Sequence, residues 1–238
     1  MKEKLHTIPV NEAFDKVSEC PVCNMRKELE EKAIDFTMGP SYMEDDVRGE
    51  TSRLGFCKSH MELLYKNQNR LGLALILKSH MDRVIKDVEK QSASSTKIAA
   101  PSLFKKQGSS LGVVSYMEKL NSSCYICEMI NRTFERYIAT VFYLYRHEEE
   151  FRQKFKACQG FCNDHYALLY KVAPKHLSGS QLKSFTDDLN LLYIENMKRV
   201  RDDLEWFINK FDYRYANEPW KNSKDALPRA ITKTNSII

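Results

Sequence analysis

Residues 54–66 read Leu-Gly-Phe-Cys-Lys-Ser-His-Met-Glu-Leu-Leu-Tyr-Lys, and residues 160–171 repeat the pattern as Gly-Phe-Cys-Asn-Asp-His-Tyr-Ala-Leu-Leu-Tyr-Lys. Each stretch carries a Cys-x2-His pair, and a Cys-x2-Cys pair precedes each of them at nearly the same distance, with 33 and 34 residues between the pairs. The eight side chains are Cys20, Cys23, Cys57, His60, Cys124, Cys127, Cys162 and His165. Two sets at matched spacing indicate a shared role.

Three thiolates and one imidazole form a standard closed tetrahedral shell for Zn2+. The order along the chain predicts two structural zinc ions, with Cys20 and Cys23 joined to the pair 57/60 and with Cys124 and Cys127 joined to the pair 162/165. Residues i and i+3 share a helix face, so each Cys-x2-His pair can offer both ligands to one ion. A closed shell has no open position, which argues against a catalytic zinc. An Fe–S cluster on the same ligands stays open as an alternative.

The similarity between the two halves extends beyond the ligands. Residues 43–48 match residues 147–152 at the same offset of 104 that separates Cys20 from Cys124, and the offset becomes 105 at Cys57 and Cys162. This predicts an internal duplication. We expect a first metal-binding repeat over residues 1–90, a polar linker over 91–110, a second metal-binding repeat over 111–211, and a C-terminal tail over 212–238.

Composition and periodicity favour helices. The 238 residues are 42% hydrophobic and include only 8 Gly and 7 Pro, which suits a helical core. Apolar residues at steps of three and four predict long helices from Cys57 to about Lys90 and over about 180–211. Shorter helices are expected near 25–36, 42–53, 126–145, 147–157 and 162–172. The predicted fold is an all-α, internally duplicated helical bundle stapled by two Cys3His metal sites, with a loosely held chain beyond Asp225.

Other features narrow the functional classes. The first residues lack the apolar core of a secretory signal, and no run approaches the roughly 18 apolar residues of a membrane span, so we expect a cytoplasmic protein. The pI of about 8.7 and the mixed charge signs give only weak support for nucleic-acid binding. No nucleophile–base pair or phosphate loop can be picked out, so no catalytic residue is assigned. Cys158 is interpreted as a spare thiol.

Several segments together resemble an uncharacterised bacterial family. The segments are Cys20-Pro21-Val22-Cys23, residues 41–48 (Ser-Tyr-Met-Glu-Asp-Asp-Val-Arg), residues 55–60, residues 206–214 (Trp-Phe-Ile-Asn-Lys-Phe-Asp-Tyr-Arg) and residues 218–228. The family is a domain of unknown function, and automatic naming sometimes calls its members ABC-transporter substrate-binding proteins. That name implies a signal peptide and an α/β fold, which this sequence does not predict. The resemblance supports the metal motifs and implies no activity.

These observations favour a zinc-stabilised cytosolic binding or adaptor protein with an unknown protein partner. One alternative is a redox- or metal-responsive protein, in which the Cys3His sites hold labile zinc or an Fe–S cluster. Another alternative is a nucleic-acid-binding protein. The segment 212–223, with Tyr213, Arg214 and Trp220, is expected either to dock its rings on the bundle or to form a binding loop.

Overall fold

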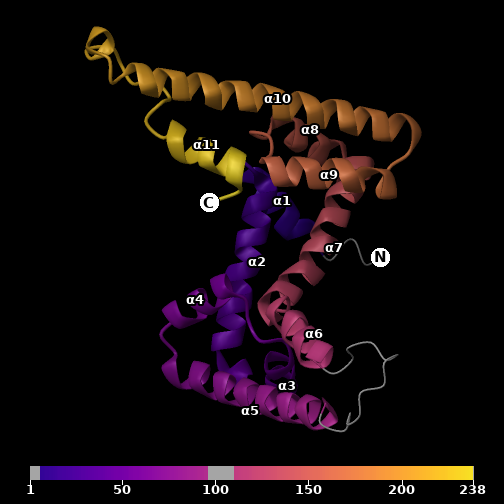
Figure 1. Ribbon diagram of the computed structural model, residues 1–238. Helices are drawn as coiled ribbons and strands as arrows, with labels where there is room; N and C mark the ends of the chain where they lie inside the picture. The colour runs from indigo at the N-terminus through magenta and orange to yellow at the C-terminus, as the bar shows by residue number, and fades with distance from the viewer. Residues whose placement is uncertain (1–5, 96–109, 238) are drawn as a thin grey trace, which may run out of the picture. The chain divides into compact units, whose positions relative to one another are not determined.

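A computed structural model describes residues 6–95 and 110–237, and over these ranges the chain forms eleven α-helices and no strand (Figure 1). The helices are α1 (Thr7–Asp15), α2 (Pro21–Met38), α3 (Asp45–Leu54), α4 (Lys58–Lys66), α5 (Arg70–Ser95), α6 (Ser110–Asn121), α7 (Tyr125–His147), α8 (Glu149–Ala157), α9 (Asn163–His176), α10 (Gly179–Asn209) and α11 (Ala226–Asn235). Two short 3-10 helices, η2 (Pro40–Met43) and η3 (Tyr213–Tyr215), complete the set. The predicted all-α class is confirmed.

Two turns place the first Cys-x2-His pair. Gly55 ends α3 with φ of 59°, a left-handed conformation that suits glycine. Gln68 has φ of 71° and separates α4 from α5, so the single helix expected from Cys57 to Lys90 is wrong. The side chain of Asn69 accepts a hydrogen bond from the N–H of Gly72 at 2.9 Å and so caps the new helix. The polar run at 67–69 was the sequence signal for this break.

The chain folds into two compact units, each assembled from segments that pack more closely with one another than with the rest. Unit 1 comprises Met1–Leu29 and Thr133–Ile238, and unit 2 comprises Glu30–Arg132. Helices α2 and α7 each contribute residues to both units. The units therefore do not coincide with the consecutive repeats expected at 1–90 and 111–211. Most of the expected linker, residues 96–109, lies outside the described residues.

The core of unit 1 is aromatic. Phe14 of α1 packs against Phe151 of α8 with ring centroids 4.9 Å apart, and Phe155 lies 5.2 Å from Phe185 of α10. Rings from α1, α7, α8, α10 and the segment before α9 meet in this cluster, which consists of Phe14, Phe142, Phe151, Phe155, Phe161 and Phe185. In Figure 1, α10 runs alongside α9 and α11, and both pairs are in contact. This packing fixes the start of α9, where two of the predicted ligands lie.

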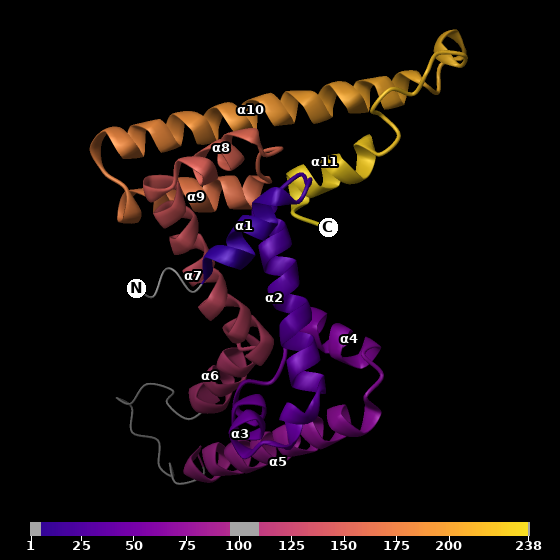
Figure 2. The same cartoon turned by 180° about the vertical axis from the view of Figure 1, so that it is seen from behind.

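Unit 2 is built around the contact of α3 with α5, which Figure 2 shows from behind. Helices α4 and α6 also pack on α5. The buried aliphatic side chains Leu54, Leu64, Leu73 and Ile76 come from α3, α4 and α5 and fill the space between them. Burial of each such side chain contributes about 1.5–3 kcal/mol, so this cluster holds the start of α4 against its neighbours.

The acidic runs at 44–46 and 148–150 lie at the N-terminal ends of α3 and α8. Arg48 pairs with Asp45 at 2.7 Å, and Arg152 pairs with Glu149 at 2.5 Å, each one turn along the same helix. Acidic side chains are favoured at the positive end of a helix. Both acidic runs therefore suit the helix ends at which they lie.

The chain from Ala226 to Ile237 is ordered, contrary to expectation. It forms α11, which packs against α9 and α10 and buries Ala226 and Lys233 almost completely. The segment before it is held by rings: Trp206 Nε1 donates a hydrogen bond to the carbonyl oxygen of Pro219 at 2.9 Å. Trp220 lies 6.0 Å from Phe207, so part of the tail docks on the end of α10.

Among the helices of the described residues, none combines the length and the apolar content that a membrane crossing requires.

Candidate metal centres

All eight predicted ligands occupy equivalent positions on helices. Cys20, Cys57, Cys124 and Cys162 each directly precede a helix, namely α2, α4, α7 and α9, and the second ligand of each pair lies three residues on, in the first turn. The backbone confirms this geometry, because the N–H of Met61 donates to the carbonyl oxygen of Cys57 at 2.9 Å. The positive ends of the helix dipoles therefore point at the sulfurs and favour thiolates.

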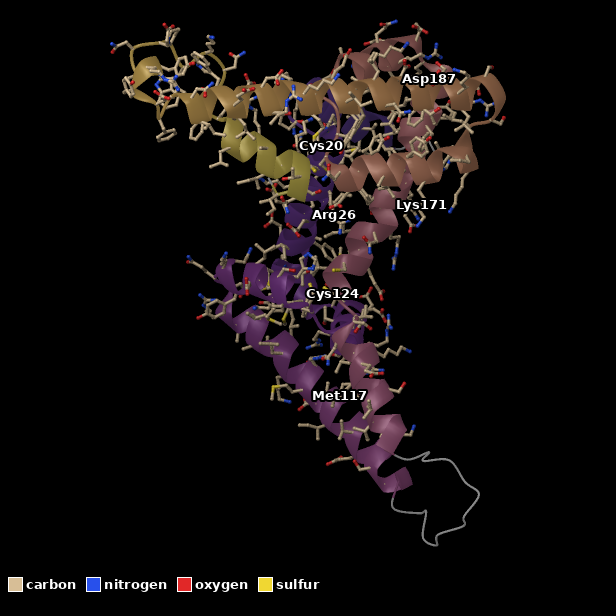
Figure 3. The ribbon with its side chains drawn as sticks, turned by 45° about the horizontal axis from the view of Figure 1, so that its top comes forward. Cys20, Arg26, Met117, Cys124, Lys171 and Asp187 are labelled. Carbon is tan, nitrogen blue, oxygen red and sulfur yellow. The ribbon has the colours of Figure 1, made fainter. Side chains whose placement is uncertain are left out.

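In unit 1, the ligand atoms of Cys20, Cys23, Cys162 and His165 converge, and we call this group the unit-1 tetrad. His165 Nδ1 lies 3.5, 3.3 and 3.2 Å from the Sγ atoms of Cys20, Cys23 and Cys162, respectively. The sulfurs of Cys23 and Cys162 are 3.6 Å apart. All four side chains are buried. Cys20, labelled in Figure 3, marks the position of this tetrad.

In unit 2, the ligand atoms of Cys57, His60, Cys124 and Cys127 converge in the same way and form the unit-2 tetrad. His60 Nδ1 lies 3.2 Å from the sulfurs of Cys57 and Cys124 and 3.3 Å from that of Cys127. The sulfurs of Cys57 and Cys127 are 4.0 Å apart. Cys124, also labelled in Figure 3, is buried, whereas Cys57 and Cys127 are half-buried.

The grouping of the ligands differs from the one predicted. The sequence order suggested that each repeat completes its own shell, but each tetrad combines the Cys-x2-Cys pair of one repeat with the Cys-x2-His pair of the other. The exchange follows from the fold, because the start of α2 packs in unit 1 with α9, while the start of α7 packs in unit 2 with α4. The two groups contain the eight residues that the sequence singles out, but the pairs are combined differently from the prediction.

The spacing within each tetrad suits a single tetrahedral ion. With Zn–S bonds of about 2.3 Å and Zn–N bonds of about 2.1 Å, sulfurs lie about 3.8 Å apart and a sulfur lies about 3.6 Å from the nitrogen. The observed S–S distances of 3.6 and 4.0 Å and the S–N distances of 3.2–3.5 Å are close to these values. The ligand atoms in each group all lie within 4.8 Å of one another.

The unit-2 tetrad has a carboxylate behind its histidine. Glu30 Oε1 lies 3.0 Å from His60 Nε2, on the far side of the ring from the sulfurs. A carboxylate in this position orients a metal-bound imidazole and increases its basicity. Nothing in the residues around Glu30 distinguishes it in the sequence, so the pattern of ligands alone did not identify it.

The unit-1 tetrad is enclosed by α11 and the residue after it. The hydroxyl of Ser236 donates to the sulfur of Cys162 at 3.1 Å. The ammonium of Lys233 is 1% exposed and donates to the carbonyl oxygens of Glu19 and Gln159, which lie close in sequence to Cys20 and Cys162. Desolvation lowers the pKa of Lys233, and the neighbouring carboxylate of Glu19 opposes this effect. No pattern in the sequence predicted these contacts of Ser236 and Lys233.

The short distances within each tetrad also shift the pKa values of its side chains. The hydrogen bond with Cys124 raises the pKa of His60 to about 9. Burial acts to raise the pKa of Cys124, but hydrogen bonds from His60 and the neighbouring backbone outweigh it and lower that pKa to about 6. In unit 1, hydrogen bonds from Cys20 and Cys23 lower the pKa of the Cys162 thiol. Each tetrad thus already favours one thiolate beside its histidine.

Cys158 belongs to neither tetrad. Burial raises the pKa of its thiol to about 11, which keeps it protonated and poorly reactive at neutral pH. This agrees with its interpretation as a spare thiol.

Comparison with curated proteins and with solved structures gave no match. One family does match, and it covers residues 1–238, the whole of the sequence that carries the two tetrads; its description is "Family of unknown function (DUF6062)". The chain therefore belongs to this family of unknown function, DUF6062, as the resemblance of its motifs implied.

Proposed function

We propose that the protein is a zinc-stabilised helical binding or adaptor module, in which each tetrad holds one Zn2+ that closes one unit of the fold. The observation that carries this proposal is the convergence of four ligand atoms within 4.8 Å, from residues as far apart as Cys20 and His165. A zinc ion at such a point cross-links two distant helix starts, and structural zinc sites contribute directly to folding free energy.

The ligand spacing favours a single ion over an Fe–S cluster. A cluster places several iron and sulfide atoms between its cysteine ligands, which requires more room than one ion. The S–S distances of 3.6 and 4.0 Å match a shared single ion instead. All four positions of the shell are filled by protein, which supports a structural role over a catalytic one.

The binding role is supported by apolar side chains that the fold leaves in solvent. Ile208, Phe211 and Tyr213, at the end of α10 and in the segment after it, are 67%, 76% and 87% exposed. Exposed apolar and aromatic groups that lie close together are typical of surfaces that contact a protein partner. The proposed partner therefore contacts this end of α10.

Metal content of purified, untagged protein tests the zinc assignment. We expect two zinc ions per chain, a colourless protein, and loss of one ion in each of the variants Cys57→Ser and Cys162→Ser. The control variant Cys158→Ser retains both ions. A content near zero with full helicity would contradict the proposal.

Double variants test which ligands share an ion. Cys20→Ser combined with Cys162→Ser removes two ligands of the unit-1 tetrad and should cost one zinc ion. Cys20→Ser combined with Cys57→Ser removes one ligand from each tetrad and should cost both. Grouping within the sequence repeats predicts the reverse, so the two counts separate the arrangements.

The partner contact is tested by the paired changes Phe211→Ser and Tyr213→Ser. Both side chains are mostly exposed, although the ring of Phe211 lies 5.3 Å from that of Phe207, so the melting temperature should fall less than in Trp220→Ala, while cross-linking to a partner in cell extract should be lost. The matched variant Trp220→Ala removes a ring that packs on Phe207 and should lower the melting temperature. Unchanged cross-linking in the double variant would remove this surface from the proposal.

A further inference from the structure

The two tetrads share the same ligand types but differ in access. All four ligands of the unit-1 tetrad are buried, with Cys20, Cys23 and Cys162 at 1%, 3% and 0% exposure. In the unit-2 tetrad, Cys57 and Cys127 are both half-buried, so each of these residues keeps part of its surface in contact with solvent. Access is one of the factors that select which thiolates react with oxidants.

The sulfurs of these two half-buried residues are also neighbours. Cys57 Sγ and Cys127 Sγ lie 4.0 Å apart, at the starts of α4 and α7. Cys57 directly precedes α4 and Cys127 lies in the first turn of α7, so neither residue belongs to a helix interior. The pair is therefore placed for a disulfide once the metal no longer separates the sulfurs.

The charges around the tetrads reinforce the difference. A shell of three thiolates, one neutral imidazole and Zn2+ carries a charge of −1. In unit 2 the carboxylate of Glu30 adds a further negative charge through His60, which makes the thiolates more electron-rich. A serine hydroxyl lies beside a ligand sulfur in both tetrads, because Ser236 donates to Cys162 at 3.1 Å and Ser59 Oγ lies 3.4 Å from Cys57 Sγ. Unit 1 has in addition the buried ammonium of Lys233, which lies beside both of its ligand segments. Hydrogen bonds and nearby cations withdraw charge from thiolates and lower their nucleophilicity.

From these observations we propose that the unit-2 tetrad is an oxidation site, at which a peroxide converts the thiolates of Cys57 and Cys127 into a disulfide and releases the zinc ion. The unit-1 tetrad keeps its zinc under the same conditions. This inference rests on the proposed zinc occupancy and assigns the reactive chemistry to one named pair of cysteines.

The step is balanced with hydrogen peroxide as the oxidant. One thiolate attacks a peroxide oxygen, the O–O bond breaks, and the resulting sulfenic acid is attacked by the second thiolate to form the S–S bond. Two electrons pass from sulfur to peroxide, and two protons from solvent complete two water molecules. Cys124 and His60 are left with too few partners for a closed shell, so the ion leaves and the cross-link between α4 and α7 changes from metal to disulfide.

The experiment starts from protein with a measured content of two zinc ions per chain, in the Cys158→Ser background to remove the spare thiol. Hydrogen peroxide is added, zinc release is followed with a chromogenic chelator, and free thiols are alkylated at intervals. Mass spectrometry then maps the disulfides. We expect one zinc ion per chain to leave about tenfold faster than the other, together with a Cys57–Cys127 disulfide. Reduction with a thiol and added zinc should restore both ions.

Lys233→Met and Ser236→Ala test why the unit-1 tetrad is protected. Each variant should speed release of the slow ion and leave the fast ion unchanged, because its change lies in unit 1. A starting content of two ions followed by equal release rates, or by first oxidation at Cys20, Cys23 or Cys162, would overturn the inference and leave the zinc assignment intact. A disulfide within Cys124 and Cys127 would also overturn it. A starting content below two would contradict the zinc assignment itself.

Discussion

The ammonium of Lys233 donates a hydrogen bond of 2.7 Å to the carbonyl oxygen of Glu19, the residue before the ligand Cys20. The same ammonium donates to the carbonyl oxygen of Gln159, three residues before the ligand Cys162. One side chain of α11 thus ties together the two segments that supply the unit-1 tetrad. Helix α11 buries few apolar residues, and the buried ammonium of Lys233 holds it against unit 1.

Replacing this cation should destabilise unit 1. Lys233→Met keeps the length of the side chain but leaves the buried carbonyls of Glu19 and Gln159 without this donor, while the carboxylate of Glu19 keeps its hydrogen bond from Arg199 at 2.6 Å. Unsatisfied buried groups of this kind cost about 1–3 kcal/mol. We expect a lower denaturation midpoint in a urea titration with no change in the number of zinc ions bound at saturation. The control is Lys224→Met at an exposed position, where the midpoint should not move; equal midpoints for both variants would contradict the role of Lys233.

The carboxylate of Glu30 should set the zinc affinity of unit 2. Loss of a carboxylate behind a metal-bound histidine typically weakens metal affinity by about 10–100-fold. Glu30→Gln should therefore weaken one of the two sites, as measured by competition with a chelator of known affinity. The neighbouring exposed Glu31→Gln is the matched control and should leave both affinities unchanged. A uniform effect of Glu30→Gln on both sites would count against a local action through His60.

Zinc affinity in unit 2 should rise with pH. The pKa of His60 is raised to about 9, so below that pH zinc must displace a proton from its ring. The pKa of Cys124 is lowered to about 6, so this thiolate is already formed above that pH. Between pH 6 and 9 the apparent affinity should increase, and calorimetry in buffers of different ionisation enthalpy should record proton release. Burial raises the pKa of Cys127 to about 12, so its thiol also loses a proton when zinc binds, and a flat profile would show that neither His60 nor Cys127 gives up a proton.

The stability of the metal-free protein should also depend on pH, because the pKa shifts of His60 and Cys124 act in opposite directions. The raised pKa of His60 gives stability that is present below its unfolded value of 6.5 and is lost as pH rises through about 9. The lowered pKa of Cys124 gives stability that is present above 9.0 and is lost as pH falls through about 6. Between pH 6.5 and 9 the loss of the first contribution offsets the gain of the second, so the melting midpoint of zinc-stripped protein should rise only between about pH 6 and 6.5 and then stay level to pH 9. A midpoint that rises steadily to pH 10 would contradict the thiolate–imidazolium pair.

Cutting the chain between the repeats should leave both metal centres intact. A protease site inserted within residues 96–109 separates the two sequence repeats, yet each tetrad takes two ligands from either fragment. The cleaved protein should elute as one species in size-exclusion chromatography and retain two zinc ions. Separate fragments, each carrying one ion, would indicate shells completed within a repeat.

The sequence singled out the eight residues of the two tetrads but could not predict how the pairs combine. Both groupings join one Cys-x2-Cys pair to one Cys-x2-His pair, and both give the same ligand set, so spacing carries no information that separates them. The choice depends on which helix starts pack together, and the fold places the start of α2 in unit 1 with α9 and the start of α7 in unit 2 with α4. The bonds of Glu30 and Lys233 depend on the same packing and leave no local pattern.

The helices were predicted best where apolar residues recur regularly. α7, α8 and α10 lie close to the expected ranges because their buried residues follow the helical period. The break at Gln68 was missed because neighbouring apolar residues continue at helical spacing on either side of it. α11 was missed because its main buried group is the charged Lys233 and its stability comes from ion pairs such as Arg229 with Asp203 at 2.8 Å.

The exchange of ligand pairs between repeats has an evolutionary consequence. A chain with only one repeat would carry a Cys-x2-Cys pair and a Cys-x2-His pair that, in this geometry, never meet within one molecule. Such a chain would complete its shells only as a two-fold symmetric homodimer with two identical metal sites shared between subunits. Fusion of the two genes would then have made the assembly independent of protein concentration, and it would have freed the two sites to diverge in exposure and reactivity.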